Sequence, residues 1–369
     1  MTGSVLFYVQ YLLGIGHLQR AQRIADALAG EGLDVTLVSG GAPVDLGVPA
    51  RSLIVRGGAL GASRSWKIVQ LPPIRARDAS FALVDGAGRP VDDELWQARR
   101  RTLLAAFAAA RPDVVALEGF PFSRRAFRVE LDPLIAAARG AARLVSSIRD
   151  ILVVRDDPLR QREIVARVRA DFDRVLVHGD PAFVPLEASF RAAPEIADRL
   201  VYTGYIAAAE DESAEGGDAG GDPEGVVVSA GGGAAGRALL QAALAARRAG
   251  CLAALRWRVL AGPHLPEAAF RALRDELPRN VVVERFRRDI ARLLRRARVS
   301  VSQAGYNTVL DVLAARVPAV LVPFAEGRET EQTLRAEALA KRGVAEIVHA
   351  AELSPERLAA AIERASARG

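Results

Sequence analysis

Cysteine, lysine and long apolar runs are all scarce in this chain of 369 residues. Its single cysteine, Cys251, excludes an internal disulfide and is typical of a reducing compartment. No uninterrupted apolar run reaches the length of a membrane-spanning helix. The apolar start of the chain has no basic segment before it and stops at Gly14, so we expect a β-strand there rather than a signal peptide. We therefore expect a cytoplasmic protein, either free or peripherally attached to a membrane.

Lysine occurs only as Lys67 and Lys341, so arginine carries almost all of the positive charge behind the formal net charge of +6. A basic chain raises the question of nucleic-acid binding. Here the arginines are spread along the sequence, and no aromatic-rich motif for RNA or single strands accompanies them, so we expect no nucleic-acid partner. Anionic lipid or a phosphorylated ligand suits the same charge.

The composition predicts two α/β domains joined by a linker. Half of the residues are apolar, which excludes disorder for most of the chain. Residues 207–224 are acidic, rich in glycine and without large apolar side chains, which is typical of a flexible linker. Residues 1–206 and 225–369 each begin with an apolar strand, a glycine turn and a helix. That order is the signature of a doubly wound, Rossmann-like domain.

The clearest pattern in the second half covers residues 302–343. Gly305 turns the chain into a predicted helix, and residues 319–322 form a short apolar run typical of a buried parallel strand. A second helix is predicted between Thr330 at its start and Gly343 just past its end.

The turn at Gly305 has two interpretations. A glycine turn before a helix aims free backbone N–H groups and the positive end of the helix dipole at one spot, which favours a phosphate. Thr308 and Asp311 equally fit a capping box, in which both side chains only satisfy backbone donors.

The order of these features resembles the C-terminal half of the family 28 glycosyltransferases, which have two Rossmann-like domains in the arrangement called GT-B. The resemblance implies that Thr308 and nearby backbone hold the diphosphate of a nucleotide-sugar donor. It also implies that Asp311 binds the ribose and that Glu331 and Gln332 bind the sugar hydroxyls. The remaining donor-side positions are Arg287 near the base, and Gly231, Gly232, Gly233, Gly305 and Asn307.

The first half opens with a predicted strand over residues 5–11, a helix over 18–29 and a second strand over 34–39. The glycine turn between the first strand and the helix, Gly14-Ile15-Gly16, lacks the third glycine of the dinucleotide fingerprint. No acidic residue ends the second strand, so we do not expect NAD as a cofactor.

His17 is the only one of the four histidines that directly follows a strand-end glycine turn. Such residues lie at the carboxyl edge of the sheet, where ligands bind. The resemblance implies that His17 removes the proton of the acceptor hydroxyl, a task that suits an ordinary pKa near 6.5. A helix-start histidine with only local hydrogen bonds is the alternative.

Glu118 ends a predicted strand over residues 112–118. Inverting plant-type relatives of this architecture carry an acid at this strand end, so the resemblance implies that Glu118 orients His17 as in other histidine–carboxylate pairs. A solvated strand-end acid is the alternative. Other polar or glycine residues at the same predicted edge form the expected acceptor side: Gly14, Gly16, Arg20, Arg149, Asp150 and His178.

Two further segments have simple interpretations. Residues 120–128, FPFSRRAFR, mix aromatic side chains with arginines and could meet a membrane surface or an anionic acceptor, but a charged loop over the core is the simpler interpretation. The acidic residues 92–94 are expected in the first turn of a helix, where they favour the dipole, rather than in a metal site.

The chain departs from the lipid-II-forming members of family 28 at two positions near His17. Ile15 interrupts a glycine run that is richer in those enzymes, and Arg20 stands where they have a proline. The resulting pattern, G-x-G-H-x-x-R, is similar to that of the sugar-nucleotide hydrolases of the same superfamily.

The sequence therefore predicts an inverting, metal-independent glycosyltransferase without a cofactor. It would move a hexose from a nucleoside-diphosphate sugar, with UDP-sugar as the family's usual donor, to a hydroxyl of a small-molecule or lipid-linked acceptor. No Asp-x-Asp metal motif ends a predicted strand. A nucleotide-sugar hydrolase, an epimerase and a non-catalytic sugar-nucleotide binding module stay open as alternatives.

Overall fold

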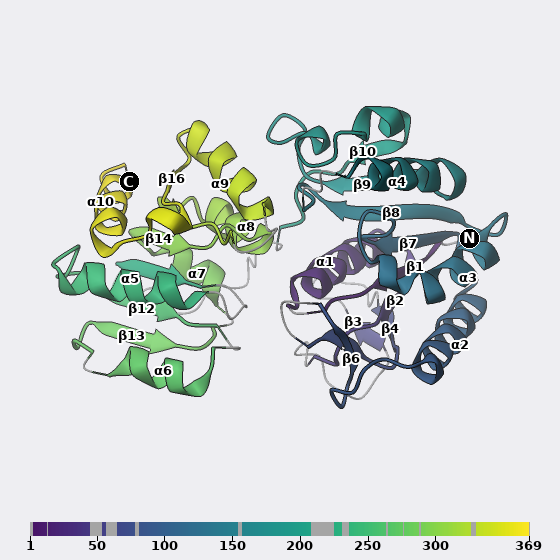
Figure 1. The fold of residues 1–369 in the computed structure, drawn as a ribbon, viewed down its shortest axis with the longest axis horizontal. Helices are drawn as coiled ribbons and strands as arrows, with labels where there is room; N and C mark the ends of the chain where they lie inside the picture. Colours follow the sequence, from purple (N-terminus) through teal and green to yellow (C-terminus); the bar gives the residue numbers. More distant parts are fainter. Residues whose placement is uncertain are drawn as a thin grey trace. The chain divides into compact units, whose positions relative to one another are not determined.

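The chain forms two compact units, Met1–Ile206 and Ala207–Gly369. The computed structural model, drawn in Figure 1, describes residues 3–12, 14–44, 54–56, 65–77, 81–153, 157–207, 225–230, 236–262, 265–275, 277–287, 289–325 and 330–368. The predicted linker after Ala207 and the predicted donor glycines Gly231, Gly232 and Gly233 lie outside these residues. Within them, no helix combines the length and the apolar character needed to cross a bilayer.

A twisted sheet lies at the centre of the N-terminal unit (Figure 1). Its strand order is β10-β9-β8-β7-β1-β2-β4-β3, and its neighbouring strands are parallel except β3 and β4. The strands are β1 (Ser4–Val9), β2 (Asp34–Ser39), β3 (Ile54–Arg56), β4 (Ser65–Gln70), β7 (Val114–Glu118), β8 (Arg143–Arg149), β9 (Arg174–His178) and β10 (Leu200–Tyr202). A separate antiparallel pair is formed by β5 (Ile74–Ala76) and β6 (Leu83–Asp85).

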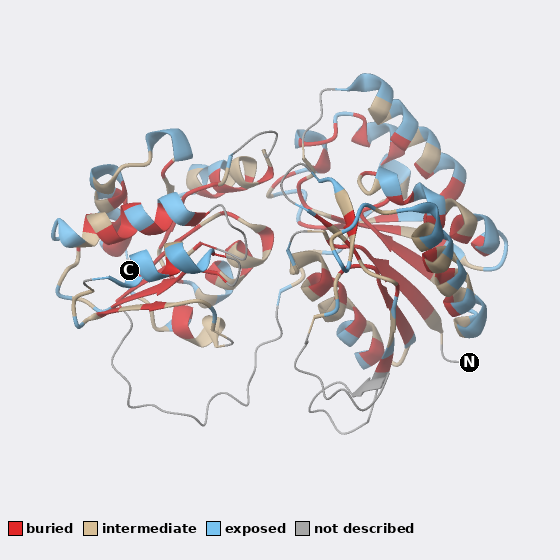
Figure 2. Ribbon diagram, turned by 60° about the horizontal axis from the view of Figure 1, so that its bottom comes forward, coloured by how far each residue is buried: buried red, intermediate tan, exposed pale blue. Residues whose placement is uncertain are grey.

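Helices cover both faces of this sheet. Alternate residues of a strand point to opposite faces, and in β1 this places Phe7 with helix α1 (Gly16–Gly30) and Tyr8 with the opposite cluster. That cluster contains residues of α2 (Asp93–Ala110), α3 (Arg128–Ala138) and α4 (Pro158–Asp171). The central strands are buried while the outer faces of the helices are exposed (Figure 2). Short 3₁₀ segments lie at Arg125–Phe127, Leu186–Ala188 and Ala193–Arg199.

The C-terminal unit has a sheet of order β13-β12-β11-β14-β15-β16, in which neighbouring strands are parallel. Its strands are β11 (Val226–Ser229), β12 (Trp257–Leu260), β13 (Val281–Glu284), β14 (Val299–Ser302), β15 (Ala319–Leu321) and β16 (Ala345–Ile347). Its helices are α5 (Arg237–Arg248), α6 (Glu267–Arg274), α7 (Ile290–Arg295), α8 (Tyr306–Ala315), α9 (Glu331–Lys341) and α10 (Pro355–Ser366), with a 3₁₀ turn at Ala350–Glu352. This order of parallel strands and helices is the predicted Rossmann-like α/β class.

Both sheets have a point where the order of strands reverses. In the N-terminal unit β1 lies between β2 and β7, and in the C-terminal unit β11 lies between β12 and β14. Ligands of doubly wound folds bind at the carboxyl ends of the strands at such a point. Each unit therefore has one edge at which a ligand site is expected.

One local expectation was wrong and another was confirmed. Helix α8 begins at Tyr306 with Gly305 at its N-cap, so Thr308 lies inside the helix and the capping-box interpretation fails. Thr330 is the N-cap of α9 and Gly343 lies just past the end of that helix, as expected, although the Thr330 side chain makes no capping hydrogen bond. The acidic run behaves as expected, because Asp92 caps α2 by accepting a 2.8 Å hydrogen bond from the Leu95 N–H.

Candidate active site

The reversal point of the N-terminal sheet brings together two segments that are about a hundred residues apart in sequence. β1 and β7 are direct neighbours, with Tyr8 opposite Leu117. The chain leaves β1 and enters α1 at Gly16, so His17 is the second residue of that helix. Glu118 is the last residue of β7. Adjacent strand ends therefore deliver a histidine and a carboxylate to one edge of the sheet.

His17 and Glu118 are in hydrogen-bond contact. The distance between His17 Nδ1 and Glu118 Oε1 is 2.7 Å, and the side chains are 24% and 2% exposed. An ionised carboxylate can only accept, so the proton lies on Nδ1 and the Nε2 atom is the ring's acceptor. The third member of the group is Arg20, which is also 2% exposed and donates to the same Glu118 Oε1.

The environment favours a neutral histidine beside an ionised carboxylate. Burial lowers the pKa of His17 to about 4, with further lowering from Arg124 and Arg149, while Glu118 acts in the opposite direction. Burial alone would raise the pKa of Glu118, but His17, Arg20 and Arg124 together hold that pKa well below its ordinary value. At neutral pH the imidazole can therefore take up a proton at Nε2.

The predicted acceptor-side residues divide into two groups. His178 is buried at the end of β9, where its Nε2 lies 2.8 Å from Ser147 Oγ and its Nδ1 lies 2.8 Å from Thr203 Oγ1. Burial and the charge of Arg20 lower the pKa of His178 to about 3. With both ring nitrogens in contact with hydroxyls, His178 suits a structural role better than that of a base. Asp150 is fully buried and accepts from the Ile151 N–H.

The other predicted acceptor-side residues are Arg149, Gly14 and Gly16. Arg149 ends β8, directly opposite His178 in the pairing of β8 with β9, and its charge acts on His17. Gly14 is exposed, and a Cβ added there would meet nothing within 4 Å. Gly16 is the first residue of α1.

Sequence reasoning missed Arg124 as part of this group, because it was placed in a charged loop over the core. It follows the turn after β7 and has a left-handed backbone with φ of 63°. Its Nε donates a 2.9 Å hydrogen bond to the Gln10 carbonyl, and its charge acts on both His17 and Glu118. The next residue, Arg125, is 60% exposed. No periodic pattern distinguishes two adjacent arginines, so the sequence gives no signal for this difference.

The C-terminal unit places its predicted donor residues around the start of α8. Gly305 is the N-cap, and Asn307, Thr308 and Asp311 lie half-buried on the following turns. Gln332 lies close by, because its Oε1 accepts hydrogen bonds from the Ala304 N–H at 3.0 Å and the Phe324 N–H at 3.1 Å. These contacts hold the side chain of Gln332 beside the start of α8.

Two other predicted donor residues already have strong partners. Glu331 is buried and accepts a 2.9 Å hydrogen bond from Arg335, which also donates to the Ala304 carbonyl. Arg287 forms two 2.7 Å hydrogen bonds with the Asp289 carboxylate, which raise the pKa of Arg287 and lower that of Asp289 to about 2. A nucleobase near Arg287 would therefore meet a guanidinium that is already paired with the Asp289 carboxylate.

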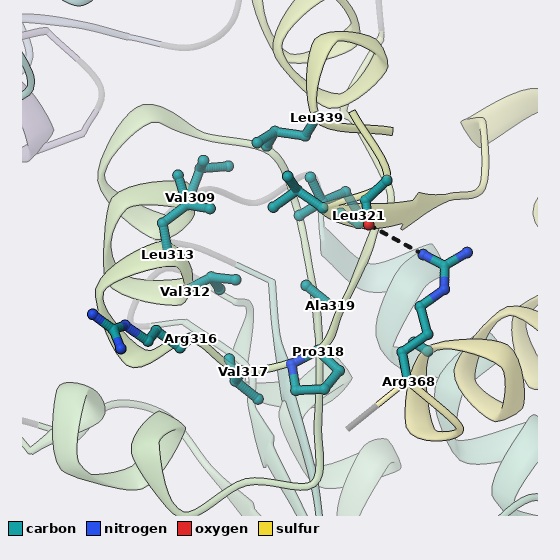
Figure 3. A pocket seen from close by; sticks show the side chains of 14 residues that line it. Val309, Val312, Leu313, Arg316, Val317, Pro318, Ala319, Leu321, Leu339 and Arg368 are labelled. Atoms are coloured by element: carbon teal, nitrogen blue, oxygen red, sulfur yellow. Dashed lines mark hydrogen bonds between the residues drawn. The ribbon is translucent and has the colours of Figure 1, made fainter. Parts of the chain in front are cut away.

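A cavity of about 350 Å³ in the C-terminal unit lies elsewhere. Figure 3 shows it between α8, β15 and the end of α10, with apolar side chains such as Val309, Leu321 and Leu339 around it and Arg316 and Arg368 at its margin. None of the predicted donor residues lines it. The candidate donor site is thus a surface at the start of α8 and is separate from this cavity. In the described parts of the chain, no group of three or more His, Cys, Asp or Glu side chains is arranged to hold a metal ion.

Comparison with known proteins identifies the C-terminal unit. Residues 226–368 match the family described as "Glycosyltransferase family 28 C-terminal domain". The chain is 36% identical over 99 residues to a UDP-N-acetylglucosamine–N-acetylmuramyl-(pentapeptide) pyrophosphoryl-undecaprenol N-acetylglucosamine transferase of Brucella anthropi, a match that covers 27% of this chain and 26% of that protein. It is 39% identical over 72 residues to the enzyme of the same name from Rhizobium johnstonii, over 20% of this chain and 19% of that protein. The chain thus spans about a quarter of the length of the curated relatives it matches.

Solved structures extend the resemblance to the fold of the whole chain. The calicheamicin glycosyltransferase CalG4 has a TM-score of 0.62 at 17% identity and covers 100% of this chain and 91% of its own. MurG of Acinetobacter baumannii has a TM-score of 0.56 at 18% identity, over 99% of this chain and 92% of its own. UGT89C1 of Arabidopsis thaliana, complexed with UDP-L-rhamnose, has a TM-score of 0.64 at 13% identity, over 98% of this chain and 89% of its own. The predicted GT-B fold and the resemblance to family 28 are confirmed.

Proposed function

We propose that this chain, whose C-terminal unit matches the C-terminal domain of family 28 glycosyltransferases, is an inverting, metal-independent glycosyltransferase. It transfers a hexose from a nucleoside-diphosphate sugar to the hydroxyl of an acceptor. The observation that carries the proposal is the His17–Glu118 contact of 2.7 Å at the reversal point of the N-terminal sheet. A neutral histidine there, oriented by an ionised carboxylate, is the group that an attacking hydroxyl needs.

The reaction is a single displacement at the anomeric carbon. His17 Nε2 takes the proton of the acceptor hydroxyl as its oxygen forms the new bond to that carbon. The bond from the anomeric carbon to the diphosphate oxygen breaks at the same time, with inversion, and the nucleoside diphosphate leaves with the electron pair. Glu118 stabilises the imidazolium that results, because its Oε1 faces His17 Nδ1. Holding both substrates in line supplies most of the remaining rate enhancement.

The start of α8 suits the leaving group. The N-cap at Gly305 has no side chain and no capping hydrogen bond of its own, which favours an anion at the positive end of the α8 dipole. Charge that develops on the leaving diphosphate is stabilised there without a metal ion. In this proposal Asp311, a further turn along α8, accepts hydrogen bonds from ribose hydroxyls, and the amide group of Gln332, which lies beside the start of α8, donates to the sugar.

The names of similar proteins favour a uridine nucleotide. The Brucella and Rhizobium relatives are named as UDP-N-acetylglucosamine-dependent transferases, and the Arabidopsis structure contains UDP-L-rhamnose. The same relatives are named for an acceptor with a pyrophosphoryl-undecaprenol group. We therefore propose a UDP-sugar donor and an acceptor that is either lipid-linked or a small molecule, used at the cytoplasmic side of a membrane or in the cytoplasm.

A panel of UDP, GDP, ADP and TDP tests the donor site by thermal unfolding. A ligand that binds only the folded state raises the melting temperature in proportion to the logarithm of its concentration over Kd. We expect UDP to raise it by several degrees at about 100-fold over Kd. Asp311→Ala should lose most of this shift, whereas Glu337→Ala, a change later in α9, should keep it. An equal absence of stabilisation by all four nucleotides would contradict the donor site.

Hydrolysis needs a separate assay, because Arg20 and His17 match the pattern of sugar-nucleotide hydrolases and the structure brings both onto Glu118. UDP release from UDP-sugars in water alone distinguishes the two activities. A transferase releases UDP slowly until an acceptor is added, whereas a hydrolase releases it at full rate without one.

A further inference from the structure

Two cationic or proton-binding side chains share one oxygen of Glu118. His17 Nδ1 and Arg20 both contact Oε1, and Arg20 Nη2 lies 3.5 Å from His17 Nδ1. His17 and Arg20 are three residues apart in α1, so they lie on the same face of the helix. In the part of the chain that the structure describes, Glu118 Oε2 is buried without a hydrogen-bond partner. Arg20 and His17 therefore share a single carboxylate oxygen.

The side chain of Arg20 is only 2% exposed, so it cannot bind the acceptor substrate directly, although the sequence analysis expected it to. Arginine is rarely buried unless it is paired, and here its buried partner is the carboxylate that orients the base. A buried carboxylate requires a compensating positive charge. If Arg20 did not supply that charge, the nearest group able to do so is His17, through uptake of a proton at Nε2.

We propose that Arg20 is a positioning residue that neutralises Glu118 and thereby keeps His17 unprotonated and able to act as the base. The proposal rests on the proposed function for the role of His17. It also explains why a guanidinium, which stays charged at every relevant pH, occupies this buried position. Arg20 acts through Glu118 and His17 and does not touch the reacting atoms.

The charged groups around His17 come from neighbouring elements. They are Arg20 on α1, Glu118 on β7, Arg124 after β7 and Arg149 on β8, and the neutral His178 on β9 is itself affected by Arg20 and Glu118. Arg124 and Arg149 also disfavour the imidazolium, and Arg20 donates to the very oxygen to which His17 is bound. Removal of Arg20 thus leaves the attraction of Glu118 for the imidazolium uncompensated, and the pKa of His17 rises.

The test is a titration of the histidines by NMR in the full chain, without any substrate. There are four histidines, and loss of one signal in His17→Ala identifies His17. In Arg20→Gln the pKa of His17 should rise by about one to two pH units, the usual effect of an uncompensated carboxylate at this range. Arg20→Lys, which keeps the charge, should restore most of the wild-type value. Arg23→Gln, one turn further along α1, is the matched control and should leave His17 unchanged.

A double variant separates positioning from simple loss of structure. In Arg20→Gln combined with Glu118→Gln the carboxylate is also gone, so the pKa of His17 should fall back by about the amount that Arg20→Gln raised it. In the single variant the acid limb of kcat/KM should move up with the pKa of His17, at unchanged KM for the donor. An unchanged pKa in Arg20→Gln, or an equal rise in the double variant, would overturn the proposal. The NMR result is independent of nucleotide binding, so failure of the donor panel and failure of this proposal are distinguishable.

Discussion

The N-terminal unit contains two buried arginine–glutamate pairs that differ in how completely they are satisfied. Arg99 and Glu130 are both fully buried, and each oxygen of Glu130 accepts from Arg99, at 2.7 Å. Arg99 also donates to the Gly40 and Pro72 carbonyls, and Tyr8 donates to Glu130. In the other pair, Glu118 accepts from Arg20 and His17 through one oxygen, and its second oxygen has no partner among the described residues.

The difference separates a structural pair from a reactive one. A buried pair with every donor and acceptor satisfied holds neighbouring segments in register and has nothing left to offer a ligand. The Arg99 network joins α2 and α3 to the carbonyls that follow β2 and β4 in this way. The pair at the sheet edge shares its carboxylate with a histidine whose second nitrogen is an acceptor. Both pairs are buried, so burial alone does not distinguish them, but the number of hydrogen bonds that each carboxylate accepts does.

The largest expected effect comes from breaking the reactive group. His17→Ala removes the proposed base, and a positioned base contributes about 10²–10⁴-fold to a rate. We therefore expect kcat to fall by about 10³-fold, with the melting temperature and the affinity for UDP unchanged, since His17 is only partly buried and the proposed donor residues belong to the C-terminal unit. The measurement is steady-state turnover of a UDP-sugar beside thermal unfolding. A variant that keeps its turnover would remove His17 from the mechanism.

Breaking the structural pair should instead lower the stability of the fold and leave the turnover of the folded protein unchanged. Glu130→Gln leaves the Arg99 charge buried without a counterion, and removal of one partner of such a pair costs about 3–5 kcal/mol. We expect a loss of this size in the free energy of unfolding by urea, with kcat of the remaining folded protein unchanged. Tyr8→Phe, which removes one hydrogen bond to Glu130, is the milder control at about 1 kcal/mol. A stable but inactive Glu130→Gln would show that the two pairs are not separate.

The sequence predicted the elements better than it predicted these pairs. Strand 34–39 has the predicted bounds, and predicted strands 112–118 and 319–322 differ from β7 and β15 only at one end, because apolar runs mark them clearly. Resemblance to inverting enzymes of the same architecture predicted that His17 and Glu118 act together, and strand adjacency explains their contact. The Arg99–Glu130 pair joins two helices without any local pattern, and the burial of Arg20 contradicts the usual exposure of arginine. Such contacts depend on tertiary packing, which periodicity does not encode.

A smaller effect is expected when the positive charge of Arg124, beside His17 and Glu118, is removed. Arg124 is anchored to the Gln10 carbonyl, and the structure shows no carboxylate paired with it in the residues it describes. If the acceptor is anionic, Arg124→Asn should raise its KM by about tenfold, the effect of about 1.4 kcal/mol. Asparagine tolerates the left-handed backbone at this position. Arg125→Asn, at the exposed neighbour, is the matched control and should leave KM unchanged; equal effects at both positions would indicate a diffuse surface charge instead.

The smallest effect concerns the stability lost between pH 6 and pH 5, which should come from the two histidines at the edge that carries Glu118. The folded-state pKa values of His17 and His178, about 4 and about 3, are below the ordinary value of 6.5. The unfolded chain therefore binds more protons between pH 6.5 and pH 4, so stability must fall as the pH falls through this window. Each histidine contributes at most about 1.4 kcal/mol for each pH unit.

Urea unfolding at pH 6 and at pH 5 isolates this contribution, because ordinary carboxylates titrate mainly below that range. We expect the wild-type chain to lose stability between these two conditions, and His17→Ala to lose about 1 kcal/mol less. Glu130→Gln, although less stable at both values, should lose as much as the wild type. A parallel fall in wild type and His17→Ala would mean that His17 is protonated in the folded state near neutral pH, and the reactive pair would then be an imidazolium–carboxylate pair that cannot accept a proton.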